Sequence, residues 1–141
     1  MRKMSISIKY NALTPMIYER IRDSAGFHHY SLEDVSVALS GGICSVVAFD
    51  DDIPVGIGRL VGDGRITFFV KDLVVLDKYQ SRGVGSMILD SLMQYARIHG
   101  APHAYIGLMS TPGKEGFYER NGFIRRPNEQ FGSGMVRFLD S

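Results

Sequence analysis

Residues 72–92 of this chain read DLVVLDKYQSRGVGSMILDSL, and they combine three local patterns that decide the fold. Residues 73–76, which follow Asp72, are apolar and include two valines, which is typical of a strand buried in a sheet. A polar loop with glycines at positions 83 and 85 follows. From Val84 onward apolar residues recur at steps of three and four, which predicts an amphipathic helix that ends at Gly100. The stretch therefore predicts a strand, a glycine-containing loop and a helix in direct succession.

The loop QSRGVG, residues 80–85, has the properties of a diphosphate cradle. The first amide hydrogens of a helix have no acceptor inside the helix, and the macrodipole makes that end positive, so a phosphate can supply the missing acceptors. Glycine lets phosphate oxygens approach the backbone, and Arg82 adds a guanidinium group suited to phosphate. A glycine pair alone is a weak signal. The Walker pattern is absent, and Ile88 stands where a dinucleotide fingerprint requires its third glycine.

The flanking sequence predicts further strands and helices in a mixed order. Alternating or apolar runs predict strands at residues 4–10, 43–49, 54–61, 65–76, 104–110, 123–126 and 135–139. Thr14, Ser31 and Thr111 predict the N-caps of three shorter helices. Residues 65–76 are apolar on both faces, so we expect this strand inside the sheet. We predict one α/β domain over residues 1–141, with a mixed, mostly antiparallel sheet of roughly six or seven strands and about four helices.

Composition excludes several classes of protein. The formal net charge of +1 gives no electrostatic footprint for nucleic acid. No apolar run approaches the ~20 residues needed to cross a bilayer, and the start MRKMSISIKY does not resemble a secretory signal. Cys44 is the single cysteine, which fits a reducing compartment, and we expect it in the core rather than as a nucleophile. The composition predicts a cytoplasmic protein that binds neither nucleic acid nor a membrane.

The pattern of possible ligands predicts no metal site. The four histidines, at positions 28, 29, 99 and 103, show no metal-binding spacing such as H-E-x-x-H. The acidic run at residues 50–52 lacks the glycine and glutamate of a calcium loop, so we expect a turn there.

Two signatures give the chain a resemblance to a known family. Residues 72–92 resemble the acetyl-CoA-binding motif of the Gcn5-related N-acetyltransferases, in which a hydrophobic strand precedes [Q/R]-x-x-G-x-[G/A] and a helix; Gln80, Gly83 and Gly85 match it in place. Residues 113–123, GKEGFYERNGF, resemble the second signature of the family, a tyrosine on a short helix followed by a turn of the type [F/N]-G-F. The resemblance implies an acetyl-CoA-dependent N-acetyltransferase.

The resemblance also implies where the coenzyme binds. In the family the strand before the cradle splays from the strand after the helix, and the pantetheine arm pairs with the exposed backbone of the first strand. The diphosphate meets amides at the start of the helix. The coenzyme-binding residues implied for this chain are Leu73, Val74, Val75, Gln80, Arg82, Gly83, Val84, Gly85, Ser86 and Phe117.

The resemblance implies catalytic roles for two residues. Tyr118 matches the usual general acid of the family, and a phenol with a pKa of about 10 is protonated at neutral pH and suited to protonate a thiolate. The alternative for Tyr118 is a packing role as an aromatic residue of the core or its rim. Asp72 resembles an acidic strand position of the glucosamine-6-phosphate acetyltransferases, although Lys71 replaces the first acid there. Asp72 either contacts the acceptor amine or is a buried partner of a basic side chain or backbone amide.

Other roles are less specific. A backbone amide of Val74 or Val75 is expected to stabilise the oxyanion. Glu115 and a chain of waters are alternative bases, and Glu115 can instead simply complement the dipole of its helix.

The acceptor is expected to be a small primary amine. In the family the loop at residues 26–30, GFHHY, borders the acceptor site, which implies substrate contacts for Phe27, His29 and Tyr30. Two alternatives stay open: acetylation of a protein lysine or N-terminus, and a non-catalytic sensor that binds acyl-CoA. Many members of the family pair through late strands, so a homodimer is one expected assembly.

Overall fold

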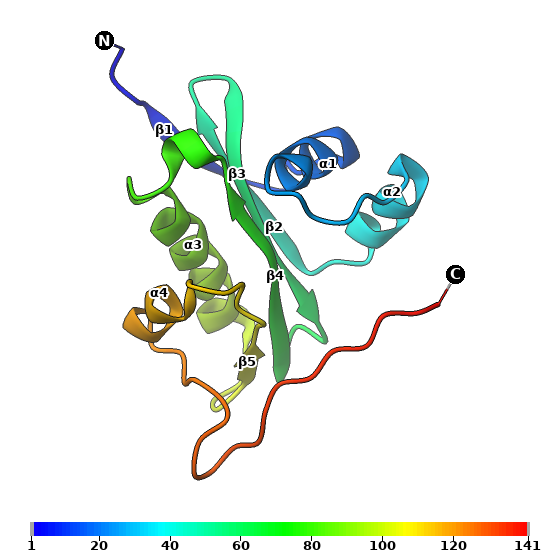
Figure 1. Cartoon of the computed structure of the whole chain (residues 1–141), viewed down its shortest axis with the longest axis vertical. Helices are drawn as coiled ribbons and strands as arrows, with labels where there is room; N and C mark the ends of the chain where they lie inside the picture. Colours follow the sequence, from blue (N-terminus) through cyan, green and yellow to red (C-terminus); the bar gives the residue numbers. More distant parts are fainter. Residues whose placement is uncertain (1, 141) are drawn as a thin grey trace. The chain divides into compact units, whose positions relative to one another are not determined.

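The computed structural model describes residues 2–140. These residues divide into two compact units, of which the first extends to Gly107 and the second begins at Leu108. Figure 1 shows the elements of each unit along the chain. Whether residues 1–141 act as one domain stays a prediction.

The first unit is built on a five-stranded sheet in the order β1-β2-β3-β4-β5. The first four strands pair antiparallel and the last pair is parallel. The strands are β1 (Ile6–Tyr10), β2 (Cys44–Asp50), β3 (Ile53–Gly62), β4 (Thr67–Val75) and β5 (Tyr105–Gly107). The predicted meander is confirmed, and β4 lies between β3 and β5, as its two apolar faces predicted.

Local chemistry explains the turn between β3 and β4. The Oδ1 atom of Asp63 accepts hydrogen bonds from the amides of Arg65, Ile66 and Thr67 at 2.8–3.0 Å. Gly64 in the same turn has a φ of +77°, which favours glycine. The three amides hold the pKa of Asp63 below its usual value. The turn therefore fixes the register of the strand that carries the candidate site.

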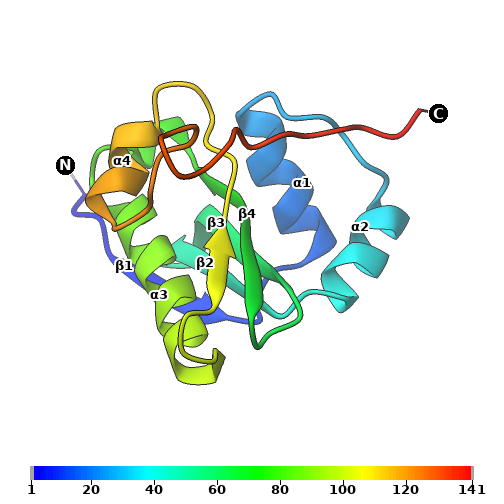
Figure 2. The ribbon, with the colours of Figure 1, turned by 90° about the horizontal axis from the view of Figure 1, so that it is seen from below.

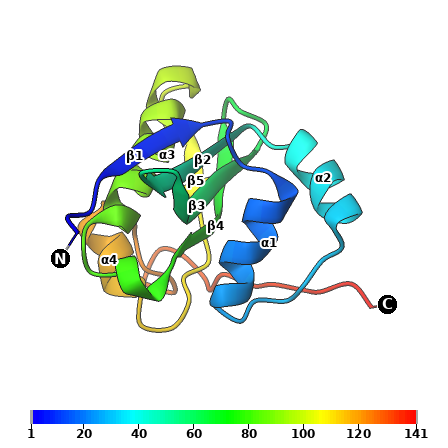
Figure 3. The same ribbon diagram turned by 90° about the horizontal axis from the view of Figure 1, so that it is seen from above.

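Three helices cover the two faces of this sheet: α1 (Pro15–Ser24), α2 (Leu32–Ser40) and α3 (Val84–His99). Figure 2 and Figure 3 show α3 on one face and α1 with α2 on the other. The predicted caps are confirmed, since the side chain of Thr14 accepts from the amide of Ile17 and that of Ser31 from the amide of Asp34. Among the helices of the described residues, none has the length and apolar character required to cross a bilayer.

Packing on the α3 face depends on two glycines of β3. A Cβ atom at Gly58 would lie 2.6 Å from Cγ2 of Ile88, and one at Gly56 would lie 2.8 Å from Cδ1 of Ile88. Any larger residue at either position would collide with Ile88, so glycine is required for α3 to pack this close to the sheet. On the opposite face the buried side chains of Tyr18, Ile21, Val35, Val47, Ile57 and Val74 form the core under α1 and α2.

The second unit contains one short helix, α4 (Glu115–Arg120). The prediction that Thr111 caps this helix is wrong: Gly113 has a φ of +88°, so the helical path begins after it, while residues 111–114 form a turn closed by the Lys114 amide on the Thr111 carbonyl. Asn121, which follows the helix directly, ends it as predicted.

The closing strands predicted at residues 123–126 and 135–139 are also corrected by the structure. Neither segment forms a strand in the described part of the chain. The side chains of Val136, Phe138 and Leu139 are 69–95% exposed. An apolar run forms a strand only where another segment supplies a partner ladder. The predicted α/β class with a mixed sheet and four helices is confirmed, with five strands in place of six or seven.

Candidate functional site

The loop between β4 and α3 has the backbone geometry of an anion cradle. Gly83 is the N-cap of α3 with a φ of 86°, a left-handed conformation that favours glycine. No side chain of the described residues caps this helix end, so its first amide hydrogens lack a side-chain acceptor. A Cβ atom at Gly83 would meet nothing within 4 Å. Space and unfilled donors therefore coincide at Gly83, as a phosphate group requires.

Two side chains of the loop have different environments: Gln80 is hydrogen-bonded to neighbouring groups, and Arg82 is exposed. Nε2 of Gln80 donates to the Val75 carbonyl at 3.0 Å and to Oδ1 of Asp77 at 3.3 Å, so Gln80 joins the loop to the end of β4. Arg82 is exposed, and its guanidinium makes one long contact, 3.9 Å, with the sulfur of Met4. The charge of Arg82 is therefore available to an anion.

A buried carboxylate anchors the start of the same loop. Asp50, at the end of β2, is 1% exposed and accepts from the Tyr79 hydroxyl at 2.6 Å, from the Ser5 amide at 3.0 Å and from Arg2 at 2.5 Å. Tyr79 belongs to η1 (Asp77–Tyr79), the single turn before the cradle. Hydrogen bonds from Arg2, then from Tyr79 and Ser5, hold the pKa of Asp50 far below its usual value. The acidic run at residues 50–52 predicted only a turn, and no local pattern indicates that Asp50 is a buried anchor.

The C-terminal part of β4 has one partner strand within the first unit. The ladder between β4 and β5 ends at Phe69 opposite Gly107. Farther along, Val74 lies opposite Ile57 and Val75 opposite Gly56 in β3, and the described residues of the first unit form no ladder on their other side. This divergence agrees with the splayed strand implied for Leu73, Val74 and Val75. Backbone groups there are placed to pair with an extended ligand.

Asp72 occupies a bulge in β4. Its φ is 57°, and the register between β3 and β4 shifts between Ile57 and Arg59. A bulge re-aims a side chain, and here it directs the Asp72 carboxylate to the α1 side of the sheet. A β-strand pattern in the sequence gives no warning of such an insertion.

The Asp72 carboxylate is 5% exposed and lies in a polar cluster. Its Oδ2 accepts from Nε of Arg59 at 2.9 Å and from the Tyr18 hydroxyl at 2.8 Å, and its Oδ1 lies 3.4 Å from Nη1 of Arg22. Burial, together with the Asp72 charge, raises the pKa of Tyr18 to about 12. Arg22 and Arg59 are therefore the basic partners that Asp72 needs if it is a buried structural acid. The contacts of Tyr18, Arg22 and Arg59 were missed because they join α1 and β3 to β4 over long sequence separations.

The loop implied to border the acceptor folds around Arg22. Nη2 of Arg22 donates to the His28 carbonyl at 3.3 Å. Its guanidinium lies 5.3 Å from the ring centre of Phe27 and 5.5 Å from that of Tyr30. The structure thus brings the predicted contacts Phe27 and Tyr30 together, both partly exposed. The third predicted contact, His29, points its Nδ1 toward Glu19 of α1 at 2.6 Å.

The second unit holds the remaining candidates. The Tyr118 ring packs edge-on against Phe117 at 5.1 Å and against Phe123 at 5.9 Å between ring centres. Burial raises the pKa of Tyr118, so its phenol stays protonated beyond neutral pH. The Glu115 carboxylate accepts from the Gly113 amide at 2.8 Å, and bonds from its own backbone amide and from Gly113 lower its pKa. The catalytic roles of Tyr118 and Asp72, and the coenzyme contact of Phe117, stay predictions.

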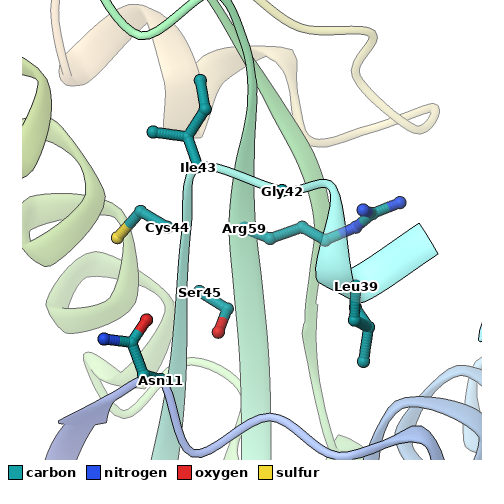
Figure 4. Close-up of a pocket in the computed structure, with 7 residues that line it drawn as sticks. All are labelled: Asn11, Leu39, Gly42, Ile43, Cys44, Ser45 and Arg59. Carbon is teal, nitrogen blue, oxygen red and sulfur yellow. The ribbon is translucent and has the colours of Figure 1, made fainter. Parts of the chain in front are cut away.

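A small hollow lies elsewhere in the first unit, at the start of β2 (Figure 4). It holds about 50 Å³ and includes the buried Cys44, whose pKa burial raises to about 11. A thiol with that pKa is a poor nucleophile, which agrees with the expected core role. The residues that line the hollow are Asn11, Leu39, Gly42, Ile43, Cys44, Ser45 and Arg59.

Comparison with known proteins points to one family. Residues 41–125 match the family described as acetyltransferase (GNAT) domain. An uncharacterized N-acetyltransferase of Bacillus subtilis, CgeE, is 32% identical over 85 residues, which is 57% of this chain and 33% of that protein. The chain thus spans about a third of the length of this curated relative.

Two solved structures extend the comparison over nearly the whole chain. A probable acetyltransferase of unknown function from methicillin-resistant Staphylococcus aureus is 25% identical, with a TM-score of 0.84, and covers 95% of this chain and 100% of its own. A GNAT-family acetyltransferase from Streptococcus pneumoniae is 28% identical, with a TM-score of 0.81, and covers 97% of this chain and 100% of its own.

Proposed function

Because the chain belongs to the GNAT acetyltransferase family, we propose that it transfers the acetyl group of acetyl-CoA to the primary amine of a small molecule. The proposal depends on two neighbouring features. Within the described residues, the start of α3 at Gly83 has no side-chain cap, and the C-terminal part of β4, which precedes it, is hydrogen-bonded to another strand on one side only. One element offers donors to a diphosphate and the other offers backbone groups to an extended arm. Acetyl-CoA carries both chemical groups in one molecule.

Different coenzyme-binding residues contact different parts of acetyl-CoA. The backbone amides from Arg82 to Ser86 donate hydrogen bonds to the diphosphate, and the exposed guanidinium of Arg82 adds a positive charge. The backbone of Leu73, Val74 and Val75 receives the pantetheine arm. Gln80 acts indirectly, since its side chain holds the loop to β4. Phe117 contacts the coenzyme through its ring.

The chemistry requires one bond to form and one to break. The neutral amine attacks the thioester carbonyl, the carbon–sulfur bond breaks, and the amine proton leaves through a base. A backbone amide of Val74 or Val75 stabilises the oxyanion, which contributes several kcal/mol in comparable sites. Tyr118 protonates the departing thiolate, which its raised pKa permits at neutral pH. Water carries the amine proton in preference to Asp72, because two arginines already neutralise that carboxylate.

The acceptor contacts the loop at residues 26–30. Phe27 and Tyr30 present partly exposed rings beside the Arg22 guanidinium, and His29 is 68% exposed. Such rings suit the apolar part of a small amine. The formal net charge of +1 gives no preference for a strongly charged acceptor. A cytoplasmic location and a homodimer stay predictions.

Release of free thiol from acetyl-CoA, measured with a panel of amines, tests the proposal. Turnover with a small primary amine supports it. Turnover only with peptides that carry lysine or a free N-terminus assigns the chain to protein acetylation instead. Tight acetyl-CoA binding without turnover by any amine or peptide supports the sensor. Absence of both binding and turnover would refute acetyl-CoA chemistry.

A further inference from the structure

Three potential metal ligands, one buried and two exposed, converge beside α1. Glu19 and Asp23 are four residues apart, so both carboxylates lie on one face of the helix, and His29 comes from the loop that follows. One ligand atom from each residue lies within 4.8 Å of the other two. Nδ1 of His29 is 2.6 Å from Oε2 of Glu19 and 4.0 Å from Oδ1 of Asp23. The histidine spacing alone could not reveal this group, because two of its members are carboxylates.

The Glu19 carboxylate supplies an independent sign of a missing ligand. Its side chain is 8% exposed, and Oε2 has no hydrogen-bond partner among the described residues. His29 approaches this oxygen closely but without hydrogen-bond geometry. The other oxygen, Oε1, accepts from the Tyr30 amide at 3.3 Å, which orients the carboxylate. A buried carboxylate oxygen without a hydrogen-bond partner lowers the stability of the folded protein. A cation bound between this oxygen and the His29 imidazole would remove that penalty.

We propose that Glu19, Asp23 and His29 bind a divalent transition-metal ion of the zinc type. Imidazole and carboxylate ligands suit zinc, whereas magnesium and calcium prefer oxygen alone. Two ligand atoms at about 2.1 Å from a tetrahedral ion lie about 3.4 Å apart, and the distances of 2.6 Å and 4.0 Å from Nδ1 of His29 lie on either side of this value, so small side-chain rotations would bring both carboxylates into place. The Asp23 side chain is 60% exposed, so it can rotate to bring its carboxylate to the ion as the third protein ligand.

The surroundings of the site agree with a cation. Two carboxylates and a neutral imidazole carry a net charge of −2, which matches a divalent ion. The positive charge of Arg22, on the same helix, is directed to Asp72 at 3.4 Å. His29 and Asp23 are both exposed, so water can complete the coordination sphere. The ion would cross-link the loop at residues 26–30 to α1 and limit its motion.

Calorimetric titration of the tag-free full chain with zinc chloride, without acetyl-CoA or amine, tests the site. We expect one ion bound per chain and a higher melting temperature in its presence. His29→Ala and Asp23→Ala each remove an exposed ligand, so the protein should fold, and each should weaken binding roughly tenfold or more. His28→Ala is the matched control, because it removes the neighbouring imidazole, which lies outside the three-residue group.

Cobalt(II) provides a second readout, since its visible absorption reports the coordination of a site that zinc occupies. We expect bands with the wild type and with His28→Ala, and none with His29→Ala. Absence of stoichiometric binding by either ion would overturn the proposal. Equal weakening by His28→Ala and His29→Ala would overturn it as well. Because acetyl transfer is not measured, failure here is distinct from failure of the proposed function.

Discussion

The Tyr79 hydroxyl lies 2.6 Å from Oδ2 of Asp50, and this hydrogen bond joins the turn before the loop at residues 80–85 to the end of β2. The same carboxylate accepts from Arg2 and Ser5 near the N-terminus. Three segments distant in sequence therefore meet at one buried acid. Only the ionised carboxyl of Asp50 offers both oxygens as full acceptors to these donors, so we expect the position of the loop at residues 80–85 to depend on that form.

The first prediction follows from the lowered pKa of Asp50. A carboxyl with a lower pKa in the folded state stabilises the protein fully above its unfolded pKa of about 3.9 and loses this contribution as the pH falls through the folded value. Asp50→Asn should lower the free energy of unfolding at neutral pH and flatten its fall below about pH 5. Urea unfolding across this range measures both effects.

Asp51→Asn is the control for that series. Its carboxylate also pairs with Arg2, at 2.8 Å, but its side chain is 62% exposed. We expect a small change in stability and an unaltered pH dependence. Equal effects of the two substitutions would contradict the anchoring role of Asp50.

The second prediction separates backbone strain from loss of the phosphate site. Gly83→Ala places a side chain at a φ of 86°, which should cost about 1 kcal/mol of stability, and its Cβ would extend into the open space where we propose that a phosphate oxygen binds. Gly64→Ala imposes similar strain at a φ of 77° in the turn between β3 and β4. Calorimetry with coenzyme A should show weaker binding for Gly83→Ala alone. Unchanged affinity in Gly83→Ala and in the bulkier Gly83→Val would show that the cradle is elsewhere.

The third prediction concerns the two interpretations of Asp72. Asp72→Asn leaves Arg22 and Arg59 without their buried counter-charge, so we expect the free energy of unfolding to fall by about 3–5 kcal/mol. Asp90→Asn, on the exposed side of α3, should be close to neutral. Chemical unfolding of both variants makes the comparison. A stable Asp72→Asn protein that has lost turnover would instead identify Asp72 as the base.

A matched double substitution strengthens this test. Adding Arg59→Met to Asp72→Asn removes a cation together with its missing partner. Part of the lost stability should return if charge imbalance causes the loss. Additive losses would show that the two side chains act independently.

The sequence was sufficient where signals are local. Glycine at position 83, the caps at Thr14 and Ser31, and the apolar repeat from Val84 depend on neighbouring residues, and the structure confirms the elements that they predict. The contacts of Asp72 were not predictable in this way. Its partners Tyr18 and Arg22 come from α1, and the bulge that directs it toward them follows from pairing with β3. The sequence indicated only that an acid in an apolar strand needs a partner.

The strand predictions near the C-terminus failed for a related reason. Residues 135–139, MVRFL, are mostly apolar and include β-branched and aromatic side chains, which favours a strand. A strand forms only when another segment supplies hydrogen-bond partners, and none does in the described residues. Pattern therefore predicts the capacity to form a strand, whereas topology decides whether one is formed.

The last prediction concerns Tyr118. Burial raises its pKa, so the phenol stays protonated throughout the neutral range and can serve as an acid there. Tyr118→Phe keeps the ring contacts with Phe117 and Phe123 and removes only the hydroxyl. Turnover should therefore fall by about 10²–10⁴-fold while coenzyme A affinity changes little. Tyr105→Phe, at a tyrosine 54% exposed, is the control and should retain full turnover. If Tyr118→Phe and Tyr105→Phe turn over at the same rate, Tyr118 is an aromatic packing residue and the thiolate takes its proton from water.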